Sequence, residues 1–188
     1  MMVRFTPLLC MTWTVLLLGC VARVSATSTS VKAVISWAGQ GQVFHIATGT
    51  RLFLGSFEGV IYVETAEGDM HEGFVRCPVS QQINTETMAT AGSGYCMIIV
   101  EGGETIFAQW SCAGKVGGCQ GEFTITGGTG RFEHITGASP LVIRSPLRVL
   151  ISDMSSGSML QVDHGIAMLT DLTYQIPAGH KRQRETKN

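Results

Sequence analysis

Apolar and polar positions alternate in short runs along most of the chain, and glycines or acid-glycine pairs separate the runs. Alternation with a period of two is typical of strands with one buried face, and no segment of helical length carries an apolar stripe of period 3.6. We therefore expect an all-β protein. The expected strands are residues 31–37, 42–48, 52–66, 70–80, 94–101, 104–112, 119–126, 141–152 and 159–173.

Two of the separators, Glu67-Gly68 and Gly102-Gly103, have the composition of tight hairpin turns. If Gly102-Gly103 closes a two-residue turn, three residue pairs meet on one apolar face that we expect to be the core. These pairs are Tyr95 with Trp110, Met97 with Ala108 and Ile99 with Ile106. The polar segment from Gln81 to Ser93 is expected to be a long loop.

Four glycines frame one large apolar residue, Phe132, late in the chain. Glycine adopts positive φ without a Cβ penalty, so this frame predicts a tight structural turn that ends a strand. Phe132 and Ile135 are three residues apart, which fits a single helical turn better than a strand. A phosphate-binding loop would need a lysine followed by Ser or Thr, and the residues after the glycines supply neither. The residues assigned to this turn are Gly127, Gly128, Gly130, Phe132 and Gly137.

Residues 1–26 have the pattern of an export signal, with Arg4, an apolar run and a small-residue cleavage site that ends at Ala26. The apolar run is too short to span a bilayer as a helix. The residues that end at Cys20 also resemble a bacterial lipobox, which would leave Cys20 as a lipidated N-terminus. Cleavage and lipidation stay open, and both predict an exported protein that is periplasmic, secreted or lipid-anchored to a bacterial membrane.

The 188 residues and the 45% hydrophobic content fit one domain with a substantial core. We expect a polar leader at 27–30, the β domain at 31–176 and a disordered polar tail at 177–188. Thirteen basic and fourteen acidic residues give a net charge of −1. No general attraction to nucleic acid follows from this balance.

The cysteines that remain after signal removal are even in number, which in an exported chain favours two disulfides with three possible connectivities. They are Cys77, Cys96, Cys112 and Cys119. A zinc site is the alternative, but the spacing contains no C-x2-C pair.

A register argument favours one connectivity. If Cys112 lies opposite Cys119, Trp110 lies over Gly121 and Ala108 lies beside Phe123, so that large residues meet small ones. The expected disulfides are therefore Cys112–Cys119 and, by elimination, Cys77–Cys96.

No catalytic constellation is visible, and no cofactor or metal is predicted. His45, His71, His134 and His164 lie in different segments, and none has the spacing of a metal-binding pair. No serine lies in a G-x-S-x-G elbow. Several apolar residues could line a ligand pocket, although core packing is the favoured interpretation, because small barrels usually fill their interiors with side chains. These candidates are Tyr95, Met97, Trp110, Phe123 and Phe57.

Several motifs together resemble the allene oxide cyclase and dirigent-like β-barrel superfamily, in particular its uncharacterised exported bacterial branch. They are Gly94-Tyr95-Cys96, Glu101-Gly102-Gly103-Glu104, Trp110, Gly121, Phe123-Thr124, Gly127-Gly128-Thr129-Gly130, Phe132 and Gly137. The resemblance implies a single eight-stranded antiparallel, calycin-like barrel with the glycine motif as a turn near one end. One of the nine expected strands is then a continuation of another strand, a bulged half or an error.

The activities of the plant relatives do not transfer with this resemblance, because none of their pocket residues can be matched one by one. The first functional hypothesis is an exported, non-catalytic barrel that binds a small apolar ligand or an extracytoplasmic protein. The alternative is a cavity enzyme of the cyclase or isomerase type. Oligomeric state is left open. A cavity of several hundred Å³ would support a ligand or substrate site, and a packed interior would exclude one.

Overall fold

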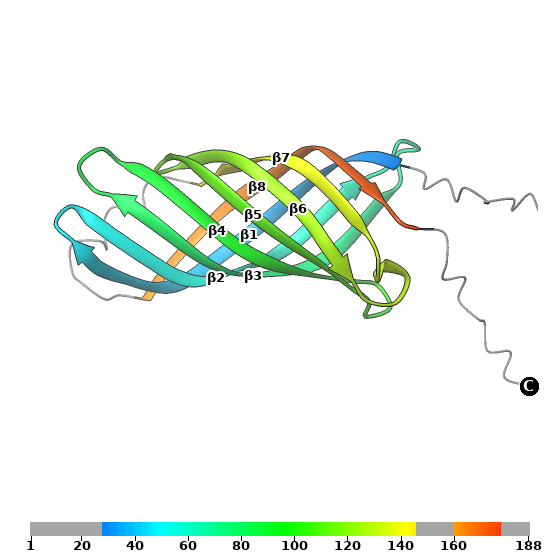
Figure 1. The fold of residues 1–188 in the computed structure, drawn as a ribbon, viewed down its shortest axis with the longest axis horizontal. Helices are drawn as coiled ribbons and strands as arrows, with labels where there is room; N and C mark the ends of the chain where they lie inside the picture. Colours follow the sequence, from blue (N-terminus) through cyan, green and yellow to red (C-terminus); the bar gives the residue numbers. More distant parts are fainter. Residues whose placement is uncertain (1–27, 146–159, 178–188) are drawn as a thin grey trace, which may run out of the picture.

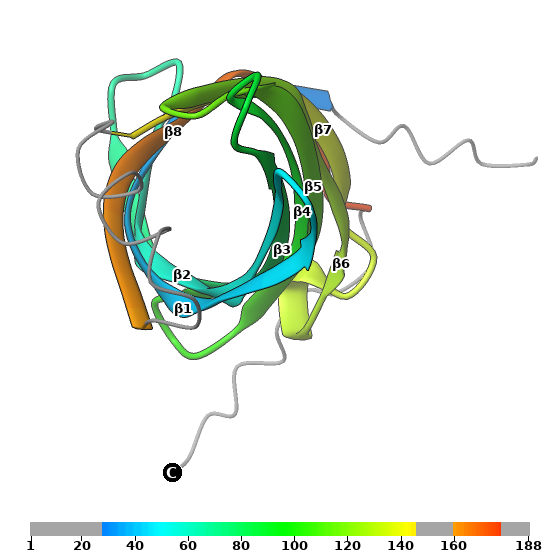
Figure 2. The same cartoon turned by 90° about the vertical axis from the view of Figure 1, so that its left-hand side faces the viewer.

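The computed structural model describes residues 28–145 and 160–177, which form one closed barrel of eight antiparallel strands (Figure 1). Each strand pairs with its neighbour in sequence, and β8 closes the ring against β1 (Figure 2). The strands are β1 (Ser28–Ala47), β2 (Thr50–Glu64), β3 (Met70–Asn84), β4 (Ala89–Val100), β5 (Thr105–Lys115), β6 (Gly118–Gly128), β7 (Thr136–Arg144) and β8 (Leu160–Gln175). The all-β, eight-stranded barrel expected from the sequence is confirmed.

Several predictions fall outside the described ranges. They concern the export signal with Cys20, the part of expected strand 141–152 that follows Ser145, and the tail from residue 178 onward. The described ranges contain no helix with the length and hydropathy of a membrane span. At the N-terminal boundary, β1 begins at Ser28, so most of the expected leader belongs to a strand. There the Ser30 hydroxyl donates a hydrogen bond to the Asp171 carboxylate on β8 over 2.6 Å.

The expected strands 31–37 and 42–48 are one continuous strand, β1. The glycines between them do not end it, because they lie on the inner side of the barrel wall, next to aromatic rings of β2. A Cβ on Gly39 would lie 2.6 Å from the Phe57 ring, and one on Gly41 would lie 2.7 Å from the Phe53 ring. These glycines therefore provide space for the rings, and joining the two segments reduces nine expected strands to eight.

The long polar loop expected from Gln81 to Ser93 is wrong, because β3 extends to Asn84 and β4 begins at Ala89. The Asn84 side chain caps the short turn by accepting hydrogen bonds from the backbone N–H groups of Glu86 and Thr87, at 3.0 and 2.8 Å. Polar residues in this segment suggested a loop, but they continue the alternation of the strands to the end of the barrel.

The β4–β5 hairpin is shifted by one residue from the expected register. Its turn contains Glu101, Gly102 and Gly103, and the Val100 N–H donates to the Glu104 carbonyl over 3.0 Å. Both glycines have left-handed φ angles, of 90° and 81°. A shift of one residue moves every side chain to the opposite face of a strand. The expected core face with Tyr95, Met97 and Ile99 is therefore wrong, since these three side chains point outward.

The β5–β6 hairpin is shifted by two residues from the expected register. It closes at Val116-Gly117, with Lys115 opposite Gly118, and this places Trp110 opposite Phe123. The expected pairing of Trp110 with Gly121 is therefore wrong. A shift of two residues keeps every side chain on its own face, so Trp110 and Phe123 both still point inward.

Gly130 and Phe132 lie in a structural turn between β6 and β7, as expected, but Gly127 and Gly128 lie at the end of β6. A single turn of 3₁₀ helix, η1 (Gly130–Phe132), follows the end of β6, and Gly130 has a left-handed φ of 57°. The Glu104 carboxylate holds this turn to the β4–β5 hairpin by accepting a 3.0 Å hydrogen bond from the Arg131 N–H and by an ion pair with the Arg131 side chain. Gly137 differs from the expectation, because it lies within β7 opposite Tyr174.

Candidate functional site

The barrel wall divides the five residues proposed to line a pocket, of which Phe57 packs against the core. Trp110 and Phe123 lie in the interior, where they are only 8% and 2% exposed. Tyr95 and Met97 lie on the outer surface and are 69% and 39% exposed. The predicted pocket residues therefore do not form one group, because the one-residue register shift in β4 places Tyr95 and Met97 on the outer surface.

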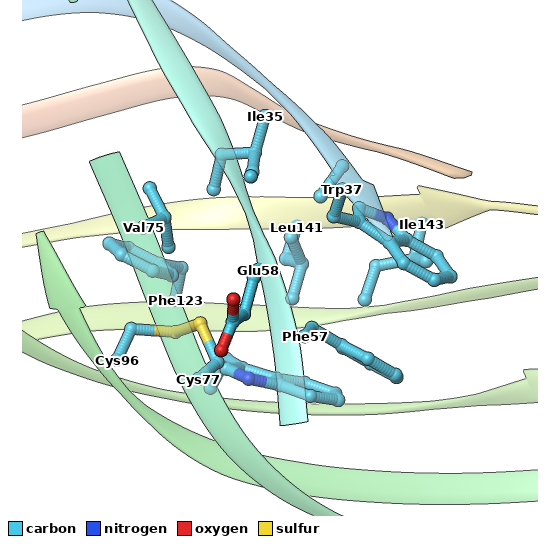
Figure 3. A pocket seen from close by; sticks show the side chains of 13 residues that line it. Ile35, Trp37, Phe57, Glu58, Val75, Cys77, Cys96, Phe123, Leu141 and Ile143 are labelled. Carbon is cyan, nitrogen blue, oxygen red and sulfur yellow. A yellow bond between two sulfur atoms is a disulfide. The ribbon is translucent and has the colours of Figure 1, made fainter. Parts of the chain in front are cut away.

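A column of stacked aromatic rings occupies the interior, and Figure 3 labels two of them, Trp37 and Phe57. The Phe57 ring lies 4.5 Å from Trp37, 6.0 Å from Phe53 and 6.2 Å from Trp110, measured between ring centroids. The three interplanar angles are close to 20° in each case. Trp37 and Phe53 were not singled out from the sequence. The signal for Trp37 was its place in the alternating series of Ala33 and Ile35, whose members are all buried.

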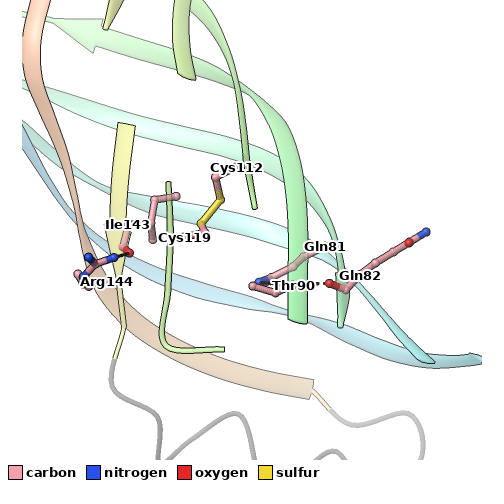
Figure 4. Close-up of a disulfide and its surroundings, with 7 residues drawn as sticks. All are labelled: Gln81, Gln82, Thr90, Cys112, Cys119, Ile143 and Arg144. Atoms are coloured by element: carbon pink, nitrogen blue, oxygen red, sulfur yellow. Dashed lines mark hydrogen bonds between the residues drawn. A yellow bond between two sulfur atoms is a disulfide. The ribbon is translucent and has the colours of Figure 1, made fainter. Parts of the chain in front are cut away.

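Both expected disulfides are confirmed. Cys77 and Cys96 are bonded between β3 and β4, with Cα atoms 4.1 Å apart, and both side chains are buried. Cys112 and Cys119 are bonded between β5 and β6 (Figure 4). Disulfides form and persist in oxidising compartments, so the pair indicates an environment outside a reducing cytoplasm.

The disulfides also exclude the zinc alternative, because they occupy all four of these cysteines. Among the described residues, no group of three His, Cys, Asp or Glu side chains is arranged to hold a metal ion. His45, His71, His134 and His164 are exposed and lie on β1, on β3, between β6 and β7, and on β8. Their positions give no acid-base pair that faces the interior.

Among the residues that the structure describes, two of the interior cavities lie beside the aromatic rings. The first has a volume of about 30 Å³ and is lined mainly by apolar groups, including Ile35, Val75 and Leu141 (Figure 3). The second has a volume of about 40 Å³ and lies toward the end of the barrel that carries the turn between β5 and β6. Each volume suits about one water molecule, whereas small-molecule sites usually occupy roughly 300–1,000 Å³.

Two of the polar residues that line the second cavity, Gln81 and Thr90, are bonded to each other, whereas the buried Trp37 Nε1 beside it has no hydrogen-bond partner. The Gln81 amide donates to the Thr90 hydroxyl over 2.7 Å, and this hydroxyl donates to the Gln82 carbonyl over 3.1 Å (Figure 4). Thr90 is 6% exposed. The Gln81 and Thr90 side chains therefore satisfy one another within the wall and are not left open to a ligand.

Large apolar side chains are exposed on the outer surface of several strands, including Val34 on β1 and Ile166 on β8. β3, β4 and β5 expose a group of large apolar side chains, which we call the outer apolar patch: Phe74, Tyr95, Met97, Ile99 and Phe107. The strand next to them, β6, exposes only polar residues at the equivalent outward positions: Gln120, Glu122, Thr124 and Thr126. Since the barrel fold needs no apolar residues on its outer surface, the patch is a candidate functional feature.

No family model matches the chain, and comparisons with curated proteins and with solved structures found no match. Function therefore has to be argued from the site itself.

Proposed function

We propose that this protein acts outside the cytoplasm as a non-catalytic β-barrel that binds a protein partner through its outer surface. The observation that carries the proposal is the aromatic packing of the interior, where the two cavities beside the rings measure about 30 and 40 Å³. A lipocalin-like ligand site or a cyclase-type active site needs roughly ten times that volume. The interior therefore favours the protein partner over the small apolar ligand and over the cavity enzyme.

The closed topology limits how a partner can bind. All eight strands are paired on both sides, so the described barrel offers no free strand edge to which a peptide could add as a further strand. Recognition would have to use side chains on the outer surface. The outer apolar patch is a part of that surface in which large apolar side chains are grouped on three neighbouring strands.

Export is part of the proposal. The two disulfides support an oxidising destination, and the leader at 1–26 supplies the route, either by simple cleavage or by lipidation of Cys20. We also propose that the chain is a distant member of the allene oxide cyclase and dirigent-like superfamily. The eight-stranded closed barrel and the turn at Gly130 support this relationship. With interior cavities of about 30 and 40 Å³, the chain would be a member whose two cavities are too small for a ligand.

Native mass spectrometry of the exported, disulfide-intact protein tests the proposal, together with a titration of palmitate as an apolar probe. After removal of residues 1–26 the chain has two tryptophans, Trp37 and Trp110, and both face the interior. We expect the mass of the polypeptide alone and no saturable change in tryptophan fluorescence. A retained stoichiometric small molecule, or a saturable fluorescence change with palmitate, would contradict the proposal.

A further inference from the structure

We infer that the outer apolar patch is a docking surface for a protein segment whose apolar side chains are bordered by Lys or Arg. The inference rests on the proposed partner-binding function and adds the place and the chemistry of the contact.

The patch is continuous across three neighbouring strands. Phe74 on β3 lies opposite Ile99 on β4, and Met97 lies opposite Phe107 on β5. Directly opposed residues have Cβ atoms about 5 Å apart, so these side chains adjoin one another on the surface. Each of the four is 39–43% exposed. Such a surface leaves a large apolar area exposed to water, and a bound partner could cover it.

The patch extends onto β2 without a break. Val60 lies opposite Phe74, and Tyr62, which is 41% exposed, is the next outward residue along β2. The apolar surface thus covers four adjacent strands and continues onto β1, where Val34 is 42% exposed and lies opposite Tyr62, whereas polar residues border it on β6. Apolar centres with polar borders are typical of protein interfaces.

The charges around the patch are unbalanced toward acid. Arg76 is the basic residue within it, and its guanidinium is already paired with Glu58 at 2.8 Å and lies 5.8 Å from the Phe74 ring centroid. Glu72 lies opposite Tyr62, and Glu101 directly follows the strand that carries Ile99. Neither Glu72 nor Glu101 has an ion-pair partner within the described ranges.

The carboxylates of Glu72 and Glu101 favour one kind of binding partner for the patch over another. A partner that places Lys or Arg beside its apolar side chains would neutralise Glu72 and Glu101, and charge complementarity of this kind speeds association and suppresses wrong partners. A second copy of this chain that docked patch to patch would instead bring two acidic borders together, since such interfaces use the same surface on both copies. The basic partner is therefore favoured over self-association.

A pair of synthetic helical peptides provides the probe: one is made of Leu and Lys in an amphipathic pattern, and the other has Glu in place of every Lys. Fluorescence anisotropy measures their binding to the disulfide-intact mature chain. We expect the Lys peptide to bind at least about tenfold more tightly than the Glu peptide. Phe74→Ser and Phe107→Ser should each weaken the Lys peptide by at least about fivefold. The double change Glu72→Gln with Glu101→Gln should weaken it by about threefold and reduce its salt dependence.

Phe44→Ser is the matched control, because Phe44 is 38% exposed but lies on β1, opposite Leu52 and away from the patch. It should leave binding unchanged, and circular dichroism should show that every variant is folded. Equal affinity for the two peptides, or an equal loss in Phe44→Ser, would overturn the inference. Sedimentation that shows self-association abolished by Phe107→Ser would overturn it as well. A ligand retained in the interior would instead count against the proposed function, so the two failures are distinguishable.

Discussion

Cys112 and Cys119 are bonded to each other across β5 and β6, although neither lies opposite the other: Cys112 faces Gly121, and Cys119 faces Gly114. The bond therefore runs diagonally between the strands, with Cα atoms 5.6 Å apart. A larger residue would not fit in place of either opposing glycine, since a Cβ there would lie 2.7 Å from the Cα of the facing cysteine. The diagonal bridge thus depends on glycine in both facing positions.

The two disulfides should contribute differently to stability. Cys77–Cys96 joins residues 19 apart in sequence and Cys112–Cys119 joins residues 7 apart, and the loss of unfolded-state entropy grows with loop length. We expect Cys77→Ala with Cys96→Ala to lower the free energy of unfolding by about 3 kcal/mol, and Cys112→Ala with Cys119→Ala by about 2.5 kcal/mol. Urea unfolding of both variants without reductant measures the order. A larger loss for the second variant would show that loop length does not determine the difference.

The turn between β6 and β7 should depend more on Ile135 than on Phe132. Ile135 is 2% exposed, whereas Phe132 is half-buried, with the Arg131 guanidinium 4.8 Å from its ring centroid. We expect Ile135→Ala to cost about 3 kcal/mol and Phe132→Ala about 2 kcal/mol. Thermal and urea unfolding of the two variants check this. If Phe132→Ala is as stable as the parent, the packing assigned to the turn is wrong.

Gly39 and Phe57 should be strongly coupled, because a Cβ on Gly39 would meet the Phe57 ring at 2.6 Å. Gly39→Ala alone should destabilise the barrel by about 1–3 kcal/mol through overpacking. In a Phe57→Leu background the same change should cost clearly less, since leucine has no ring at this position. A double-mutant cycle measures the coupling. Purely additive effects would mean that Gly39 is not required by this contact.

The sequence predicted the fold class and both disulfides because these depend on alternation and on the face that each residue occupies. Cys112 and Cys119 were paired correctly from a register that was wrong by two residues, and this worked because an even shift preserves the face. The β4–β5 hairpin shows the opposite case. The expected two-residue turn left out Glu101. With Glu101 in the turn, the register shifts by one residue, so Tyr95 and Met97 lie outside the barrel and not in the expected pocket.

The aromatic column and the outer apolar patch could not be predicted from the sequence, because both depend on contacts between different strands. Gly39 and Gly41 were interpreted as a strand break, because nothing in the chain shows that Phe57 and Phe53 from another strand occupy the space beside them. The patch joins residues that are far apart in sequence, such as Phe74 and Ile99, so it depends on register across strands. Neither feature follows from local propensity.

Acrylamide quenching of the two tryptophans of the mature chain tests most directly whether the interior is filled. Trp37 and Trp110 are both 8% exposed, and both stack with the Phe57 ring. We expect weak quenching in the folded protein and strong quenching only after unfolding in denaturant. Quenching of the folded protein that approaches the unfolded value would mean that solvent and solutes enter the barrel, and it would contradict a binding function confined to the outer surface.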